Sequence, residues 1–230
     1  MRRLAFLIPF ALSALPAGAG CMFADNEPAT RTASGHMLAL IAQNCAEAGF
    51  DFDAPLPSGR VPFREMVVLG GSPEAVAIAL EAGADPNITD KYGSPAFVDL
   101  INFSMETDDP ALLEILRLLG EAGADFSLPD NQGDLALSKA AGGGETGTVR
   151  LLLAYGADPN GLNAYARTPL FETVFGRCSP EAGAALIDKG ARLDPMPADQ
   201  LARMFDEADK ACAETAPGRD YVARLRAMRK

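Results

Sequence analysis

Apolar residues occur along the chain in short, dense blocks separated by Gly, Pro and Asp. Four of these blocks are Ala75–Leu80, Leu112–Leu119, Val149–Leu153 and Ala184–Ile187. Each block is apolar around too much of its circumference for a helix that lies on a protein surface. We therefore predict helices that are sandwiched between neighbouring helices.

A short phrase, Glu-Ala-Gly-Ala-Asp or a close variant, follows each block. Its glycines are Gly49, Gly83, Gly123, Gly156 and Gly190, with spacings of 34, 40, 33 and 34 residues. A Gly after the last helical turn can adopt the left-handed conformation that ends a helix. The Asp that follows favours a turn. The spacing predicts a repeating unit of about 33 residues, with an insertion in the unit whose spacing is 40.

A second, shorter helix is predicted downstream of each turn. Its best start is Thr168–Phe171, with Thr as the N-cap and Pro at the first helical position. Ser94–Phe97 and Val61–Arg64 are looser copies, and Gly133–Leu137 keeps only the outline. Helix-breaking residues separate the two helices of each unit, at Gly70–Pro73, Asp108–Pro110, Gly142–Gly144 and Cys178–Pro180.

This order of turn, short helix, loop, apolar helix and Gly-Ala-Asp resembles the ankyrin repeat over roughly residues 30–225. No unit keeps the family's His in the short-helix phrase, and only the unit starting at Thr168 keeps Thr-Pro-Leu, so the array has diverged. The resemblance implies an all-α solenoid of stacked helix-turn-helix units with short β-turns. It has about four clear units and a capping unit at each end.

We expect the ankyrin-repeat domain to span residues 30–230. Its units lie at roughly 30–53, 54–87, 88–127, 128–160 and 161–194, followed by a cap over 195–230. The helices of that cap are predicted near Asp199–Ala211 and Asp220–Arg229.

Residues 1–19 are typical of a secretory signal peptide, and residues 20–29 would be a linker. Arg2 and Arg3 precede the apolar run Leu4–Leu12, and the small-residue run Ala17–Gly20 offers a cleavage site after Ala19. The apolar run is too short to anchor the chain in a membrane. We therefore expect a periplasmic or secreted protein with no membrane insertion after cleavage.

Cys21 offers an alternative, since it could be the lipid-bearing first residue of a mature lipoprotein. Gly18 stands where a lipoprotein signal has a large aliphatic residue, which argues against this version.

The chain has four cysteines, Cys21, Cys45, Cys178 and Cys212. An even count in an oxidising compartment permits two disulfides, and the sequence allows three pairings. Proximity favours Cys21 with Cys45 and Cys178 with Cys212. Cys178 lies ten residues after Thr168 and Cys212 ten after Ala202, so the second pair is also in register on stacked units.

The formal net charge is −11. Such an acidic chain is repelled by nucleic acid and anionic lipid, so we expect a neutral or basic protein partner and no nucleic acid. His36 is the only histidine, which excludes a two-His metal site and any Ser-His or Cys-His chemistry away from it. We expect no metal, no cofactor and no enzymatic activity.

The stretch Asp85-x-Asn87-x-Thr89 opens like a calcium-binding loop. Asp90 and Ala96 stand where that loop requires Gly and Glu, so we interpret it as a turn.

In stacked repeats the turns and short helices line a concave face, and Tyr and Arg are common in binding hot spots. The predicted partner-binding residues in the turns are Lys91, Tyr92, Asp130, Asn131, Asn163, Tyr165 and Arg167. In the short helices they are Glu65, Lys139 and Glu172, with Val98 at the equivalent place in the remaining helix. The insertion Asn102–Asp109, with Phe103 and Met105, is a second candidate surface.

These features favour a non-catalytic, monomeric protein-binding module in the periplasm. It would act as a scaffold, inhibitor or stabiliser of another envelope protein. An immunity protein that neutralises a periplasmic toxin and a secreted effector that engages host proteins are the alternatives.

Overall fold

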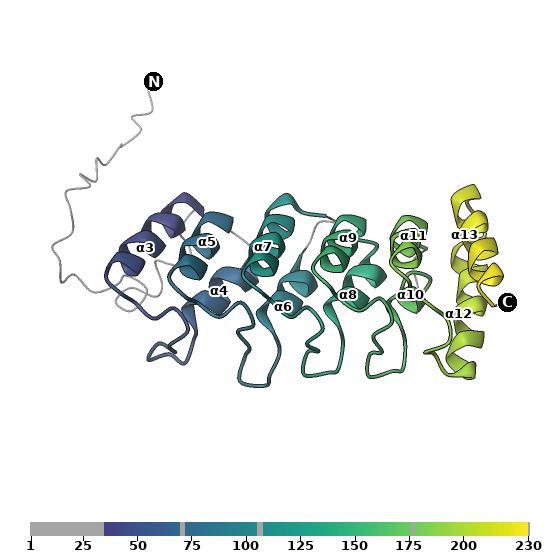
Figure 1. The fold of residues 1–230 in the computed structure, drawn as a ribbon, viewed down its shortest axis with the longest axis horizontal. Coiled ribbons are helices and arrows are strands. Elements are labelled where there is room, and N and C mark those ends of the chain that lie inside the picture. The colour runs from purple at the N-terminus through teal and green to yellow at the C-terminus, as the bar shows by residue number, and fades with distance from the viewer. Residues whose placement is uncertain (1–34, 70–71, 105–107, 176–177, 230) are drawn as a thin grey trace, which may run out of the picture.

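The chain folds into a straight stack of helices in two rows, joined along one edge by protruding loops (Figure 1). The structure, a computed structural model, describes residues 35–69, 72–104, 108–175 and 178–229. The expected signal peptide, the linker, Cys21 and Met105 lie outside these residues. In the described part, extended pairing is limited to single bridges such as Thr89 with Pro95. The predicted all-α repeat solenoid is confirmed.

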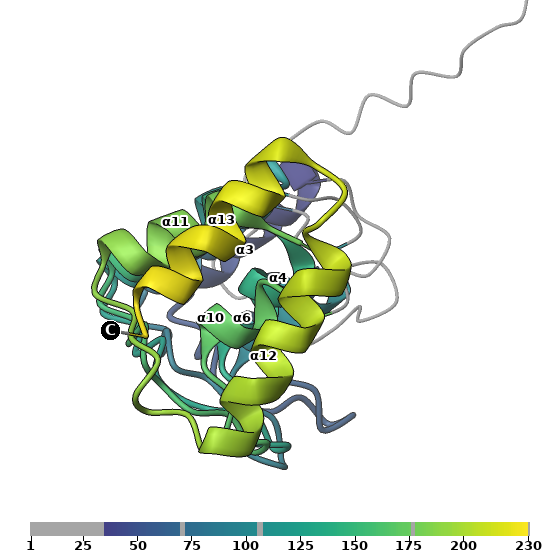
Figure 2. The ribbon, with the colours of Figure 1, turned by 90° about the vertical axis from the view of Figure 1, so that its right-hand side faces the viewer.

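The outer row consists of α3 (Gly35–Glu47), α5 (Pro73–Glu81), α7 (Pro110–Glu121), α9 (Thr146–Ala154) and α11 (Pro180–Asp188). The inner row consists of α4 (Pro62–Leu69), α6 (Ala96–Phe103), α8 (Ala136–Gly143) and α10 (Pro169–Glu172). The last pair, α12 (Ala198–Ala211) and α13 (Ala216–Ala227), crosses the C-terminal end of the stack (Figure 2).

Capping side chains and prolines decide where several of these helices begin. Ser72 Oγ accepts a bond from the Ala75 backbone N–H at 3.2 Å, and Pro73 follows it. Asp109 and Thr168 cap α7 and α10 in the same way. Because proline has no N–H to lose at the first helical position, each of these starts is favoured locally.

Glycines end the outer helices, as the sequence predicts. Gly83 and Gly123 have φ angles of 99° and 93°, in the left-handed region that disfavours other residues. At the end of α5 the backbone N–H of Ala84 donates to the carbonyl of Ala79 at 3.0 Å. This bond satisfies a carbonyl that the helix itself leaves free.

A ladder of hydrogen bonds fixes one unit against the next. In each rung, an Asn or Asp side chain after one outer helix accepts a bond from the backbone N–H after the following outer helix. The rungs join Asp53 to Asp85 (2.8 Å), Asn87 to Asp125 (2.7 Å) and Asn160 to Arg192 (2.8 Å). Asp85 and Asn87 therefore shape a turn and also hold neighbouring units in register.

One hydrophobic core runs the length of the stack. Phe63, Phe97 and Leu137 of the inner row are almost completely buried, as are Val76 and Leu152 of the outer row. A single helix pair exposes apolar sides to both neighbours, so stability depends on stacking.

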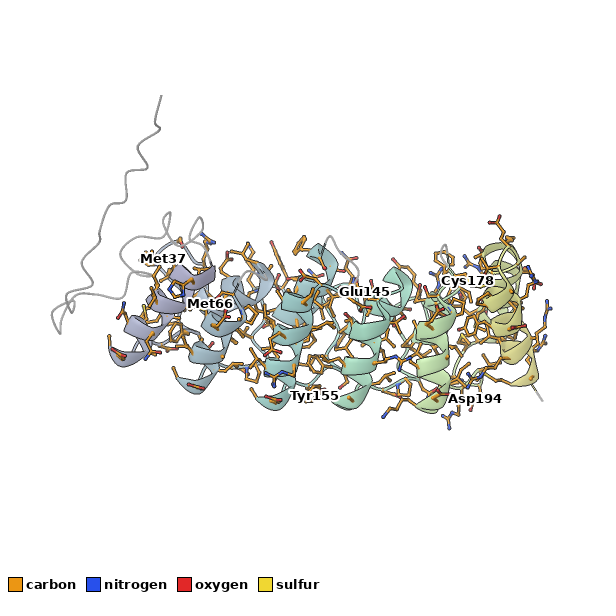
Figure 3. The ribbon with its side chains drawn as sticks, turned by 90° about the horizontal axis from the view of Figure 1, so that it is seen from above. Met37, Met66, Glu145, Tyr155, Cys178 and Asp194 are labelled. Atoms are coloured by element: carbon orange, nitrogen blue, oxygen red, sulfur yellow. A yellow bond between two sulfur atoms is a disulfide. The ribbon has the colours of Figure 1, made fainter. Side chains whose placement is uncertain are left out.

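The C-terminal pair is joined to the array by a disulfide between Cys178 and Cys212, whose Cα atoms are 5.1 Å apart. This is the pairing that the register of the units favours, and Figure 3 shows Cys178 near that end of the rod. Cys45 is buried in α3 and is also disulfide-bonded, while Cys21 lies outside the described residues.

Helix α13 begins at Ala216 and not near Asp220 as predicted from the sequence. Thr215 Oγ1 accepts the Gly218 backbone N–H at 3.1 Å, so the helix already has a capped start there.

Candidate protein-binding surface

Three hairpin loops between the outer and inner rows are built on the same side-chain bond. Asp130 Oδ1 accepts the backbone N–H groups of Gln132 (2.8 Å) and Asp134 (2.9 Å). Asp90 and Asn163 make equivalent bonds to the residues two and four places later. These bonds shape the loop, as short polar side chains do in turns. The predicted site residues Asp130 and Asn163 are therefore buried within their hairpins.

The loop tips are held rigidly and point into solvent. Tyr92 is 65% exposed and Tyr165 is 61% exposed, and Lys91 and Asn131 are exposed beside them. The Nζ of Lys91 lies 4.9 Å from the centre of the Tyr92 ring, at cation–π distance. Four of the predicted partner-binding residues are thus free for contact with a partner.

The predicted charged residues of the inner helices are already engaged within the chain. Glu65 pairs with Arg60. Lys139 Nζ lies 3.1 Å from carboxylate oxygens of both Asp130 and Asp134. Although burial alone would lower the pKa of Lys139, the bonds to these two carboxylates raise it overall.

Glu172 follows the same pattern in the fourth unit. Its Oε1 accepts a bond from Asn163 Nδ2 at 3.2 Å and lies 3.8 Å from Arg167. Burial raises the pKa of Glu172 above its ordinary value, against the opposing effects of Arg167 and Asn163. Most of the charge on this face is therefore neutralised internally.

Val98 was predicted to be exposed, and this prediction is wrong: its side chain is fully buried. The neighbouring Asp99 is partly buried and forms an ion pair with Arg64, which joins α6 to α4. Burial raises the pKa of Asp99, and the attraction of Arg64 opposes that rise. Sequence reasoning missed this pair because its two members come from different units.

An aromatic cluster surrounds Arg167 in the fourth unit. The guanidinium carbon of Arg167 lies 5.3 Å from the ring centre of Tyr165, 4.8 Å from that of Phe171 and 4.4 Å from that of Phe175. Phe171 is buried, whereas Tyr165 is exposed and Phe175 is 38% exposed. Stacked Arg and aromatic side chains of this kind dominate the affinity of many interfaces.

Phe175 was not among the predicted site residues. A signal was available, because Phe175 lies four residues after the buried Phe171, which lies in a helix that is capped by Thr168 and begins at Pro169. It packs against Phe171 with a ring-centre distance of 5.6 Å.

The predicted insertion begins within the last turn of α6, where Phe103 is an exposed apolar residue. Asp108, at the far end of the insertion, accepts backbone bonds from Gly147 (2.9 Å) and Thr148 (3.0 Å) at the start of α9. This end of the insertion is therefore anchored to the next unit.

Negative charge is concentrated in the first half of the rod. Residues 35–134 contain 17 Asp and Glu against four Lys and Arg, a net charge of −13. Residues 135–230 contain 12 Asp and Glu against 13 Lys and Arg, a net charge of +1. The rod is electrically polar along its axis.

Comparison with known proteins shows a similarity of fold. The structure is similar to the crystal structure of an ankyrin repeat domain from Acinetobacter baumannii AYE, with a TM-score of 0.62 and 23% sequence identity. The match covers 82% of this chain and 96% of that one. No family model matches the sequence, and no curated protein matches it. The chain thus has the fold of an ankyrin-repeat protein, a helical solenoid.

Two further findings concern the described residues alone. None of their helices has the length and apolar character required to span a bilayer. Nor do their His, Cys, Asp and Glu side chains form a group of three that could hold a metal ion.

Proposed function

We propose that the chain is a non-catalytic module that binds a neutral or basic protein in the periplasm, as a monomer. It would act there as a scaffold, inhibitor or stabiliser of that protein. The contact surface consists of the hairpin tips and the aromatic cluster around Arg167. The observation that carries this proposal is the presence of exposed Tyr92 and Tyr165 on backbone that side-chain bonds hold in place, with Phe175 partly exposed in the cluster beside Tyr165. Preorganised aromatic anchors lose little conformational entropy on binding.

The cysteines support the proposed location in the periplasm. A disulfide at the C-terminal end and a second disulfide-bonded cysteine, Cys45, suit an oxidising environment outside the cytoplasm. Separation of cytoplasm, periplasm and medium, followed by immunodetection of the chain, tests this part. Recovery in the cytoplasm alone would contradict it.

Capture of the native partner tests the surface. Chemical crosslinking in the native cell identifies the partner, and its affinity is then measured with purified proteins. We expect Tyr165→Ala and Tyr92→Ala to weaken binding about tenfold or more each, as hot-spot truncations do. Leu69→Ser is the matched control, because Leu69 is exposed on α4 and lies outside this surface. Unchanged affinity for both tyrosine variants would exclude the hairpin tips.

An immunity role is favoured by one observation, the net charge of −13 in residues 35–134. Acidity of this size steers a basic enzyme towards the chain and raises the association rate. Co-expression with a basic toxin targeted to the periplasm, preferably one encoded beside this chain, tests the role. If the chain does not restore growth, the immunity role is excluded.

A further inference from the structure

A groove of about 500 Å³ lies between the hairpins of the third and fourth units. Phe126 and Leu135 line it from the segment between α7 and α8, and Leu137 from α8 itself. Ala157 and Leu162 line it from the segment between α9 and α10. The two hairpins are joined beside it by a backbone bond from Ala164 N–H to the Gly133 carbonyl at 3.0 Å. Its lining reaches the hairpin tips at Gly133 and Ala164 but does not include Tyr92, Tyr165 or the other members of the aromatic cluster around Arg167.

The groove exists because the fourth hairpin lacks one side chain. Aligning the hairpins on Asp85, Asp125 and Asp158 places Gly161 at the position of Ile88 and Leu128. Ile88 and Leu128 both pack against the core, whereas Gly161 has no side chain to fill that position. The next residue, Leu162, is 43% exposed, and Thr89 and Pro129 are exposed at the same position of their hairpins.

Leu135 occupies part of the vacated space. A Cβ atom on residue 161 would lie 2.7 Å from Leu135 Cδ1, the mobile end of a side chain. Gly161 does not have a positive φ angle, so its backbone accepts other residues. The position can therefore be refilled by substitution without backbone strain.

The charge around the groove selects the kind of partner. Asp158 is the charged residue among those that line it, and Asp125 is exposed next to Phe126. The adjoining half of the rod carries the net charge of −13. An apolar recess on an acidic surface complements an apolar side chain flanked by Lys or Arg.

We propose that this groove seats one apolar side chain from a basic segment of the protein partner. The inference rests on the proposed protein-binding function and adds a second contact to it. The hairpin tips and the Arg167 cluster supply aromatic anchors. The groove accepts an anchor from the partner, and the acidic half of the rod holds the basic flanks of that anchor.

Titration of the purified chain with synthetic peptides, followed by amide NMR shifts, tests this contact. The probes are a short peptide with one leucine flanked by lysines, the same peptide with serine in place of leucine, and the leucine peptide with glutamates as flanks. We expect the first to shift the amides of Gly161 and Leu162 and the glutamate peptide to leave them unmoved. We expect the serine peptide to bind about tenfold more weakly, the loss for partial burial of one leucine. Equal binding of the leucine and serine peptides overturns the proposal, as does a shift pattern centred elsewhere.

Two variants test separately how the shape of the groove and the charge beside it contribute to peptide binding. Gly161→Ile restores the side chain present at Ile88 and fills the groove, so the leucine peptide should bind about tenfold more weakly. Asp158→Asn should weaken the lysine-flanked peptides and reduce the salt dependence of their binding. Leu69→Ser again is the control and should bind as wild type. Unaltered binding by Gly161→Ile overturns the proposal.

The native partner distinguishes failure of the groove from failure of the proposed function. If the tyrosine variants lose the partner and Gly161→Ile retains full affinity, the groove is excluded and the proposed function stands. If all of these variants retain full affinity, the groove and the hairpin tips are both excluded as contacts. If crosslinking captures no partner at all, the proposed function is excluded.

Discussion

The hydroxyl of Tyr221 in α13 lies 2.6 Å from Thr173 Oγ1, which follows α10 and is 48 residues away in sequence. Thr173 Oγ1 in turn donates to the Leu170 carbonyl at 2.7 Å, so Tyr221 is the donor in the first bond. Burial raises the pKa of Tyr221, which keeps this hydroxyl protonated. A two-bond chain thus joins the C-terminal pair to the last inner helix.

Replacing Tyr221 with Phe should destabilise the fold by about 1 kcal/mol, the typical contribution of one buried hydrogen bond. Chemical denaturation monitored by circular dichroism measures the change. The ring would remain, so packing should be preserved. A loss of stability no larger than the experimental error would show that the bond contributes nothing.

Gly183 provides the space for the same tyrosine. A Cβ atom on residue 183 would lie 2.0 Å from the Tyr221 hydroxyl oxygen. We expect Gly183→Ala to cost about 1–3 kcal/mol through overpacking. The ring carbons Cζ and Cε2 would also lie 2.2 and 2.5 Å from that Cβ, so the whole ring must be removed to relieve the clash. The double variant with Tyr221→Ala should therefore cost less than the sum of the two single changes. Additive costs would contradict this contact.

Breaking the Cys178–Cys212 disulfide should lower the free energy of unfolding by about 3–4 kcal/mol, the loop-closure value for a separation of 34 residues. The double variant Cys178→Ser, Cys212→Ser tests this without reductant. Hydrogen exchange should locate the loss of protection in α12 and α13, since stacked units unfold locally. Uniform loss along the rod would contradict that localisation.

The sequence predicts the stack well because its signals are local. Gly83, Gly123 and Thr168 each mark the end or start of a helix through their own backbone preferences. The register of Cys178 and Cys212 follows from counting within the repeat. Features of this kind need no knowledge of neighbouring units.

The surface is harder to predict because it depends on how units meet. A shift of one residue on a helix turns the side chain by about 100°, which is why Val98 is buried whereas Asp99, only partly buried, reaches Arg64. The pair Arg64–Asp99 and the groove at Gly161 both arise between units. Neither has a pattern within a single repeat, so the positions of the candidate contacts require the structure.

Glu145, between α8 and α9, should make stability depend on pH near neutrality (Figure 3). Burial raises the pKa of its carboxyl from 4.5 to about 7; a hydrogen bond with Thr148 lowers it, and the negative charge of Asp108 adds to the rise. The folded chain binds this proton more tightly than the unfolded chain. Stability from this group is therefore full below about pH 4.5 and is lost as the pH rises to about 7.

The expected loss over that range is on the order of 3 kcal/mol. Glu145→Gln keeps the shape and removes the titration, so its stability should be flatter between these pH values. Denaturation curves at several pH values compare the two proteins. If the variant and the wild type respond to pH identically, Glu145 does not titrate in this range.

At Ala166, unlike at the preceding positions, we expect a substitution to increase the stability of the fold. It occupies the hairpin position held by Gly93 (φ 87°) and Gly133 (φ 79°), and its own φ is 55°. A left-handed backbone costs an alanine about 1–2 kcal/mol that glycine does not pay. Ala166→Gly should therefore raise the free energy of unfolding by about 1 kcal/mol, after the greater flexibility of glycine in the unfolded chain is subtracted.

Gly93→Ala is the matched reverse change, because no atom lies within 4 Å of a Cβ placed on Gly93 and strain alone acts there. It should destabilise the chain by a similar amount. Thermal and chemical unfolding of both variants give the two values. Ala166 also stands between Tyr165 and Arg167, so strain at this position coincides with the proposed binding cluster, as is common at functional sites. A more stable Ala166→Gly variant with weaker partner binding would show that the strained turn orients those two side chains; equal binding would show that the strain serves no contact.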